Sequence, residues 1–312
     1  MSIEILAVGT MILRVMDTLQ ASYTVHRLDE IDDKERFLAE VGPAIRAVAT
    51  DALHGCSAEL MARLPNLEII ASSGVGYDSI AVDVARDRGI PVTITPDILN
   101  DATAELAIAL MLAFGRDIVN ADRFVRAGKW RAGGFGLTAQ IAGARAGIVG
   151  LGRIGKEIAT RCVALKMDVA YFGRREQTDQ PYRYYSDLVA MARDVDWLIV
   201  IAPGTGETEK LISADVLAAL GPEGVLVNVA RGSLVDEVAL VAALQSGALG
   251  GAALDVFADE PNVPEALLAM DTVLLSPHQG SATRVTRQAM ADLVVENLAA
   301  HFAGKPLLTP LA

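Results

Sequence analysis

Residues 147–155 read GIVGLGRIG, and this segment is the strongest indication of the fold in the sequence. Gly150, Gly152 and Gly155 form G-x-G-x-x-G, directly after an apolar run at 146–149 and directly before a helical pattern at 154–165. In this context the first glycine permits a tight turn, the second lets backbone approach a pyrophosphate, and the third lets helix and strand pack closely. The N–H groups of Arg153 and Ile154 would face the phosphates at the helix N-terminus. The stretch predicts a dinucleotide site, although G-x-G-x-x-G alone would often be an ordinary turn.

The end of the next predicted strand indicates which dinucleotide binds. Residues 168–172 are expected as that strand, and Gly173, Arg174 and Arg175 follow it. An NAD site usually has an Asp or Glu about 20 residues beyond the glycines, where it binds the ribose 2′-hydroxyl. A carboxylate would repel a 2′-phosphate, whereas two guanidinium groups would bind it. The sequence therefore favours NADP(H) over NAD(H).

Composition limits the classes of protein that need to be considered. The chain has 312 residues, of which 52% are hydrophobic, which suffices for a large core and about two domains. Its net charge of −12 argues against nucleic acid or an anionic membrane as a partner. Cys56 and Cys162 lack metal-ligand spacing and indicate no disulfide framework, which is typical of cytoplasmic proteins. We expect a cytoplasmic protein with no metal, no signal peptide and no membrane span.

Strand and helix patterns alternate along the chain, which predicts an α/β fold with parallel sheets. Strands are expected at residues 3–8, 45–50, 67–72, 90–93, 146–149, 168–172, 197–201, 225–229, 251–256 and 273–275. Helices are expected at 58–63, 80–88, 154–165 and 285–302. A further long helix, apolar nearly all round, is expected from about Asp101 to residue 118 and would lie between layers or domains.

This pattern predicts two Rossmann-like α/β domains. The dinucleotide-binding domain, residues 99–284, would be inserted into a discontinuous, flavodoxin-like substrate domain made of residues 1–98 and 285–312. The long helix from Asp101 and the loop after His278 would be the two crossings. We expect the active site in the cleft between the domains.

Five blocks of sequence resemble the D-isomer-specific 2-hydroxyacid dehydrogenases. They are ASSGVGYDSI (71–80), GIVGLGRIG (147–155), VNVARGSLVDE (227–237), ALDVFADEP (253–261) and SPHQGSAT (276–283). Their order and spacing match that family over nearly the whole chain. Within it, residues 129–155, the GRR segment and the tail at 300–310 are most similar to glyoxylate/hydroxypyruvate reductases and hydroxyphenylpyruvate reductases. The resemblance implies a preference for NADPH and a homodimer.

The resemblance also implies that Arg231, Glu260 and His278 are the catalytic set, and the chemistry of these residues agrees. An imidazole exchanges protons near neutral pH, so His278 would protonate the reduced substrate. Glu260 would hold the other ring nitrogen. Arg231 would bind the substrate carboxylate and polarise its keto oxygen. Each residue alone would more often be a surface or turn residue, but all three follow predicted strands at the edge where open α/β sheets bind ligands.

A wider set of cofactor contacts is implied in the same way. Asp255 matches the family position that bonds the nicotinamide amide, with a turn or capping role as the alternative. Thr103 would face the phosphates unless it only caps its helix. The complete cofactor set is Thr103, Gly150, Gly152, Arg153, Ile154, Gly155, Gly173, Arg174, Arg175, Ala202, Pro203, Val229, Ala230, Asp255 and Gly280.

Substrate contacts are expected from loops near both ends of the chain. Residues 73–76 form a Gly-rich loop that can offer N–H groups to a carboxylate, with a plain turn as the alternative. The complete substrate set is Leu53, Val75, Gly76, Arg231 and His278. His54, beside Leu53, would shape selectivity or structure and is not expected to be the proton donor. Trp130 and Phe135 would line the mouth of the site, across a subunit interface, or pack in a core or interface.

We therefore expect a reductase that uses NADPH to convert a small 2-keto acid, glyoxylate or hydroxypyruvate, into the D-2-hydroxy acid. Aryl-pyruvates are the nearest alternative substrates, and Gln279, where many relatives have an apolar residue, would affect the substrate range. An NAD-linked D-lactate or phosphoglycerate-type dehydrogenase is a second hypothesis, against which Arg174 and Arg175 argue. A non-catalytic NAD(P)-sensing regulator on the same fold is a third, and the complete Arg/Glu/His set opposes it only weakly.

Overall fold

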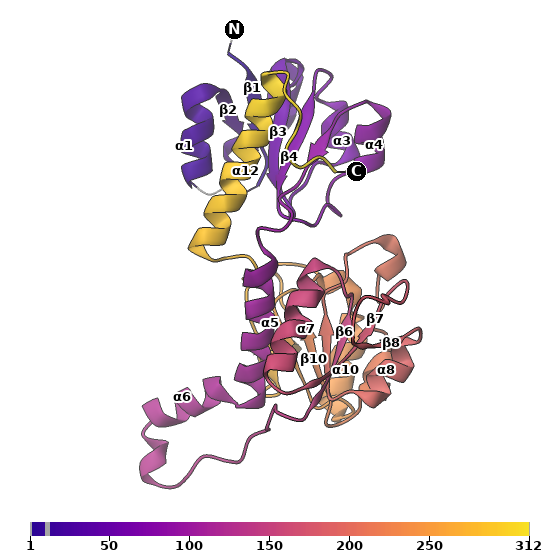
Figure 1. Cartoon of the computed structure of the whole chain (residues 1–312). Helices are drawn as coiled ribbons and strands as arrows, with labels where there is room; N and C mark the ends of the chain where they lie inside the picture. Colours follow the sequence, from indigo (N-terminus) through magenta and orange to yellow (C-terminus); the bar gives the residue numbers. More distant parts are fainter. Residues whose placement is uncertain (1, 10–12, 312) are drawn as a thin grey trace. The chain divides into compact units, whose positions relative to one another are not determined.

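The computed structural model describes residues 2–9 and 13–311, and the chain divides into two units (Figure 1). Unit 1 combines Met1–Leu99 with Thr283–Ala312, and unit 2 is Asn100–Ala282. Each unit contains one sheet whose strand pairs run parallel. The prediction of two parallel-sheet α/β domains is confirmed.

Unit 1 has a five-stranded sheet with strand order β2-β1-β3-β4-β5. Its strands are β1 (Glu4–Ala7), β2 (Thr24–Arg27), β3 (Ile45–Asp51), β4 (Ile69–Ser73) and β5 (Val92–Thr93). Its helices are α1 (Leu13–Ser22), α2 (Lys34–Glu40), α3 (Ala58–Ala62), α4 (Val82–Asp87) and α12 (Arg284–Phe302). Leu19 of α1 and Leu298 of α12 share a core with the sheet, and Figure 1 shows these helices together on it. A second core contains Leu38 of α2 and Met61 of α3.

Unit 2 has a seven-stranded sheet with strand order β12-β11-β10-β9-β6-β7-β8. Its strands are β6 (Arg145–Val149), β7 (Asp168–Phe172), β8 (Arg183–Tyr185), β9 (Trp197–Val200), β10 (Val225–Asn228), β11 (Gly251–Leu254) and β12 (Val273–Leu275). Its helices are α5 (Asn100–Gly115), α6 (Ile118–Arg126), α7 (Arg153–Ala164), α8 (Leu188–Asp194), α9 (Ala214–Leu220), α10 (Glu237–Ser246) and α11 (Glu265–Leu268). The order reverses between β6 and β9, which creates a topological switch point.

The sheet of unit 2 is buried on both faces. One core contains Met111 of α5 and Ile158 of α7, and the other contains Met191 of α8 and Leu217 of α9. Burial on both faces explains why the strands are continuous apolar runs rather than alternating patterns. Helix α7 is amphipathic, and its buried residues recur at helical spacing: Gly155, Ile158, Ala159 and Cys162.

The predicted long apolar helix is wrong at its C-terminal end. Helix α5 ends at Gly115, and Asp117 adopts a left-handed conformation with φ of 50° before α6 begins at Ile118. Asp is among the few non-glycine residues that adopt this conformation readily. Helix α5 is largely buried, whereas α6 has no buried residue. The change from core to solvent therefore occurs at this break.

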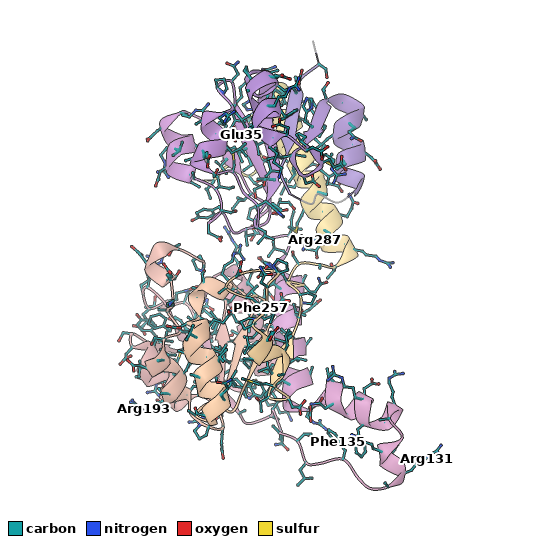
Figure 2. The ribbon with its side chains drawn as sticks, turned by 180° about the vertical axis from the view of Figure 1, so that it is seen from behind. Glu35, Arg131, Phe135, Arg193, Phe257 and Arg287 are labelled. Carbon is teal, nitrogen blue, oxygen red and sulfur yellow. The ribbon has the colours of Figure 1, made fainter. Side chains whose placement is uncertain are left out.

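The segment 116–140 forms an arm on unit 2. Figure 1 shows α6 and the loop after it projecting away from the sheet of the same unit, and Figure 2 shows Arg131 and Phe135 on this projection. None of its residues is buried, and Trp130 is 68% exposed. Phe135 is packed only partly, against Phe124, with ring centroids 5.4 Å apart. Core packing of Trp130 and Phe135 within the chain is therefore ruled out.

The two cysteines are buried thiols in different units. Burial raises the pKa of both Cys56 and Cys162 to about 12, so neither is a thiolate at neutral pH. In the described part of the chain no helix is both long and apolar enough to cross a membrane. No cluster of three or more potential metal ligands occurs among residues 2–9 and 13–311.

Candidate active site

The glycine-rich turn follows β6 at the switch point of the sheet. Gly150 has φ of +102°, and a Cβ there would lie 2.9 Å from the backbone of Ala202. A Cβ at Gly155 would lie 2.1 Å from the carbonyl oxygen of Gly150. Gly152, the N-cap of α7, differs from both because a Cβ there would meet no atom within 4 Å. Two glycines thus permit close packing, and the third leaves open space at the helix N-terminus, as is typical of phosphate-binding turns.

The candidate catalytic residues of unit 2 come from loops at the same sheet edge. Arg231 follows β10, Glu260 lies in the loop after β11, and His278 follows β12. These strands are neighbours and run parallel, so their carboxyl ends lie together. The glycine turn after β6 and the pair Ala202 and Pro203 after β9 lie at this edge as well. Ligands of open α/β sheets bind along such an edge.

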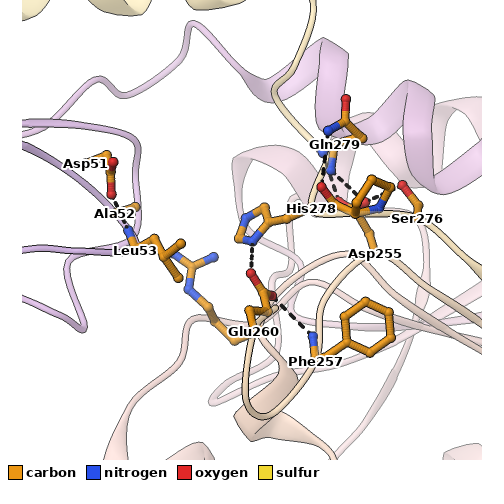
Figure 3. Close-up of polar contacts among 12 residues, drawn as sticks. Asp51, Ala52, Leu53, Asp255, Phe257, Glu260, Ser276, His278 and Gln279 are labelled. Atoms are coloured by element: carbon orange, nitrogen blue, oxygen red, sulfur yellow. Dashed lines mark hydrogen bonds and ion pairs between the residues drawn. The ribbon is translucent and has the colours of Figure 1, made fainter. Parts of the chain in front are cut away.

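His278 and Glu260 form a direct pair (Figure 3). The imidazole Nδ1 of His278 lies 2.7 Å from Oε2 of Glu260. The other carboxylate oxygen, Oε1, accepts a hydrogen bond from the backbone N–H of Phe257 at 3.2 Å. The Glu260 side chain is only 15% exposed, whereas that of His278 is 36% exposed. The glutamate therefore fixes the ring from the protein side, and Nε2 remains as the nitrogen that can exchange a proton with a substrate.

The electrostatics of the pair keep Glu260 ionised. Burial of the side chain opposes its negative charge. The hydrogen bond and charge of His278 outweigh this effect, helped by the Phe257 N–H and the positive charge of Arg231. The pKa of Glu260 therefore lies below its ordinary value. An ionised Glu260 stabilises a positive charge on the imidazole, which suits His278 to proton transfer.

Asp255 organises the loop that carries His278. Its carboxylate is 1% exposed and accepts hydrogen bonds from Ser276 Oγ at 2.6 Å, Gln279 N at 2.7 Å and Gly280 N at 2.8 Å. Its carbonyl oxygen accepts the His278 N–H at 2.8 Å. These bonds hold His278 at φ of 52°, a conformation that a non-glycine residue adopts only when its surroundings impose it. Asp255 thus has the turn role that the sequence left as the alternative to a nicotinamide contact.

Arg231 is held by a polar residue at the end of a buried strand. Asn228 is 1% exposed, and its Nδ2 donates to the carbonyl oxygen of Arg231 at 2.9 Å. The Asn228 side-chain oxygen accepts the N–H of Ala230 at 3.0 Å. The half-buried guanidinium of Arg231 also donates to the Ala230 carbonyl at 2.8 Å. The amide of Asn228 therefore fixes the turn on which the arginine stands.

The remaining cofactor candidates of unit 2 lie on this edge or next to it. Arg174 and Arg175 follow β7, and both side chains are exposed. Thr103 is buried in the first turn of α5. It lies beside Gly280, since a Cβ built on that glycine would be 3.6 Å from Thr103 Cγ2. Gly280 itself gives its N–H to Asp255. Thr103 is therefore a neighbour of the His278 loop.

Leu53, Val75 and Gly76 belong to unit 1, where they lie in loops after β3 and β4. Asp51 fixes the first loop, because its Oδ1 accepts the N–H of Leu53 at 2.9 Å (Figure 3). Leu53 is 56% exposed. The same carboxylate contacts Nδ1 of His54 at 2.9 Å, so this histidine has a local structural partner.

Sequence reasoning missed the residues that hold the site in place. Asn228 bonds to the backbone of Arg231, and Ser276, in the loop that carries His278, bonds to Asp255. Gln177 bonds to the glycine turn at Leu151. One signal was available for Asn228, since it is a polar residue in an otherwise apolar strand. Ser276 and Gln177 gave no comparable signal, because their partners lie 21 and 26 residues away in the sequence.

Comparison with known proteins places the chain in a family. Residues 108–280 match the family described as D-isomer specific 2-hydroxyacid dehydrogenase, NAD binding domain. This range contains the glycine turn and all three candidate catalytic residues. The match supports a nicotinamide cofactor for unit 2.

Several relatives match over almost the whole chain. A hydroxyphenylpyruvate reductase of Plectranthus scutellarioides is 46% identical over 310 residues, which cover 98% of this chain and 99% of that protein. Glyoxylate/hydroxypyruvate reductase A of Arabidopsis thaliana is 45% identical, with 99% of each protein covered. The crystal structure of an NADPH-dependent glyoxylate/hydroxypyruvate reductase from Sinorhizobium meliloti, in complex with NADP and malonate, is 45% identical and has a TM-score of 0.94, covering 100% of this chain and 97% of that one. The chain belongs to the D-isomer specific 2-hydroxyacid dehydrogenase family.

Proposed function

We propose that the protein reduces a small 2-keto acid, glyoxylate or hydroxypyruvate, to the corresponding D-2-hydroxy acid with NADPH. The observation that carries this proposal is the 2.7 Å contact between His278 and Glu260 at the sheet edge that also bears the glycine turn. Reduction of a keto group requires a proton donor and a dinucleotide site close together, and the His278–Glu260 pair and the glycine turn lie at the same edge of the sheet. The names of the relatives from Arabidopsis thaliana and Sinorhizobium meliloti support the substrate class.

The protein's own part in the reaction is to bind the substrate and to supply a proton. Bound NADPH would supply the hydride that reaches the keto carbon. His278 would give the proton on Nε2 to the former keto oxygen, because Glu260 occupies Nδ1. Glu260 would stay ionised throughout and stabilise the positive charge of the ring before transfer. Arg231 would bind the substrate carboxylate and polarise the keto oxygen, with Val75 and Gly76 as further proposed carboxylate contacts.

The preference for NADPH is proposed to rest on Arg174 and Arg175. Both are exposed directly after β7, which is where Rossmann-type dinucleotide sites bind the ribose of the cofactor. The double substitution Arg174→Ala with Arg175→Ala should raise KM for NADPH and leave KM for NADH nearly unchanged. Arg193→Ala, an exposed arginine on α8, is the matched control for loss of positive charge. An equal effect on both cofactors would remove the 2′-phosphate assignment.

The substrate proposal is tested by steady-state reduction of several keto acids. The Plectranthus scutellarioides relative is named for an aryl-pyruvate, and a 42% identical protein of Gluconobacter oxydans is named 2-ketogluconate reductase. Hydroxyphenylpyruvate and 2-ketogluconate therefore belong in the panel beside glyoxylate and hydroxypyruvate. A higher kcat/KM for either larger acid would replace the small-substrate proposal.

We also propose that the arm at residues 116–140 joins two copies of the chain. The arm has no buried residue and exposes Trp130 and Leu137. It carries five basic and two acidic residues, in a chain with a net charge of −12. A basic and apolar arm is complementary to the acidic remainder of a second copy.

Analytical ultracentrifugation tests the proposed homodimer. The parent should sediment at about twice the 32.9 kDa chain mass, and Trp130→Glu with Leu137→Glu should shift it toward the monomer. Val238→Glu, an exposed apolar position on α10, is the control and should not change the mass. A monomeric parent would reject the proposal.

A further inference from the structure

The loop that carries Arg174 and Arg175 is fixed at both of its ends. At the first end, the hydroxyl of Tyr184 donates to the carbonyl oxygen of Gly173 at 3.2 Å. At the second, the backbone N–H of Gln177 donates to the hydroxyl oxygen of Tyr171 at 2.6 Å. The two arginines lie between these anchors. A loop that is exposed to solvent is thus restrained on either side of its charged residues.

The anchors themselves belong to the core of unit 2. Tyr171 is fully buried in β7, and it is the register partner of Tyr184 in β8. Their rings pack with centroids 5.4 Å apart. Both hydroxyls bond to the backbone of the arginine loop. The two phenol groups therefore transfer the rigidity of the sheet to that loop.

A further bond links the arginine loop to the glycine turn. The side-chain amide of Gln177 donates through Nε2 to the carbonyl oxygen of Leu151 at 2.8 Å. Leu151 lies between Gly150 and Gly152 in the turn that is proposed to hold the pyrophosphate. The side chain of Gln177 is half-buried, so the bond is partly protected from water. Gln177 thus joins the predicted site of the 2′-phosphate to that of the pyrophosphate.

We propose that Gln177, assisted by Tyr184, is a positioning residue that selects NADPH by holding Arg174 and Arg175 at a fixed distance from the glycine turn. This inference rests on the proposed NADPH preference and deepens it. Arginine recognises phosphate through a planar fork whose bonds depend on orientation, and two exposed arginines on a loose loop would lose rotational freedom on binding. A preformed loop lowers that cost for the cofactor that has a 2′-phosphate. NADH makes no use of the arginines, so its affinity does not depend on the tether.

The test compares Gln177→Leu and Tyr184→Phe with the parent chain. Each change removes the polar group that donates the tether's hydrogen bond and retains much of the side chain's volume. Gln180→Leu is the matched control, because Gln180 is in the same loop but, within the described residues, its side-chain amide bonds to Asp179 alone. Dissociation constants are measured for NADPH and NADH, and for the fragments 2′,5′-ADP and 5′-AMP. Thermal melting checks that each variant is folded.

Gln177→Leu and Tyr184→Phe should each weaken NADPH and 2′,5′-ADP by about 2- to 10-fold, the range expected for loss of one hydrogen bond. NADH and 5′-AMP should change less than about 2-fold, and Gln180→Leu should change none of the four. In a background that already carries Arg174→Ala and Arg175→Ala, Gln177→Leu should have no further effect on NADPH.

Equal weakening of both cofactors, or of neither, by Gln177→Leu and Tyr184→Phe would overturn the inference, because a purely structural bond affects both alike. If the arginine substitutions discriminate between the cofactors but Gln177→Leu does not, the positioning role fails and the NADPH proposal stands. If the arginine substitutions do not discriminate either, both fail.

Discussion

Replacing Glu260 by Gln removes one charge from the pair that is proposed to drive proton transfer. The substitution preserves the length of the side chain, so an oxygen can still lie near the 2.7 Å position from His278 Nδ1. It removes the charge that stabilises a protonated imidazole. Hydrogen bonds to charged groups contribute about 1.5–3 kcal/mol and neutral ones about 0.5–1.5 kcal/mol. The difference between these two ranges, about 1–1.5 kcal/mol, corresponds to a loss in kcat of about 5- to 13-fold.

Stopped-flow and steady-state measurement of NADPH oxidation with glyoxylate would test this value. The dissociation constant of NADPH should not change, because Glu260 acts through His278 and does not belong to the glycine turn. Asp259→Asn is the control, since Asp259 is an exposed neighbour whose carboxylate bonds only to Asn262 within the described chain. It removes the same charge from the same loop and should leave kcat nearly unchanged.

Two results would rule out this role of the Glu260 charge. One is a Glu260→Gln variant with the kcat of the parent, which would mean that the carboxylate charge does not contribute to the reaction. The other is an equal loss in Asp259→Asn, which would show a general effect of the loop's charge rather than of the contact with His278.

Three more predictions follow from the same loops. The pKa of Glu260 is lower in the folded protein than in the unfolded chain, so its contribution to stability is complete above the ordinary Glu value of about 4.3 and is lost as pH falls through the lowered value. Denaturant titration should therefore show that the free energy of unfolding lost in Glu260→Gln becomes smaller below about pH 4. Asp255→Asn places an amide N–H₂ or a weaker acceptor opposite the backbone N–H groups of Gln279 and Gly280. It should therefore lower the free energy of unfolding by about 1–3 kcal/mol. An unchanged melting temperature would reject the loop-organising role of Asp255. His278→Ala should lower kcat by about 10²- to 10⁴-fold with little change in NADPH affinity, and an unchanged kcat would reject His278 as the proton donor.

The sequence was most informative where one physical requirement dominates the local pattern. Strands β7 and β12 have the predicted bounds, because short apolar runs flanked by polar or glycine residues allow few other placements. The glycine turn was predictable because Gly150 and Gly155 each meet backbone that excludes any side chain. The short edge strands β2 and β8 were not predicted, since their residues are half-exposed and lack a clear apolar run.

The supporting contacts of the site depend on tertiary structure and could not be predicted from the sequence. Asp255 reaches Gly280 across 25 residues of sequence, and Gln177 reaches Leu151 across 26. The break at Asp117 was also missed, because apolar residues continue on both sides of it and only burial distinguishes α5 from α6. Residue type and spacing thus indicated which groups do chemistry, while the groups that orient them emerged only from the fold.

Reduction of a small 2-keto acid with NADPH is best examined by measuring kcat/KM for a panel of keto acids with each cofactor. We predict turnover of glyoxylate or hydroxypyruvate that exceeds turnover of hydroxyphenylpyruvate, with kcat/KM about tenfold or more higher for NADPH than for NADH. Absence of NADPH oxidation with every keto acid in the panel, or turnover with NADH alone, would rule out an NADPH-dependent keto acid reductase.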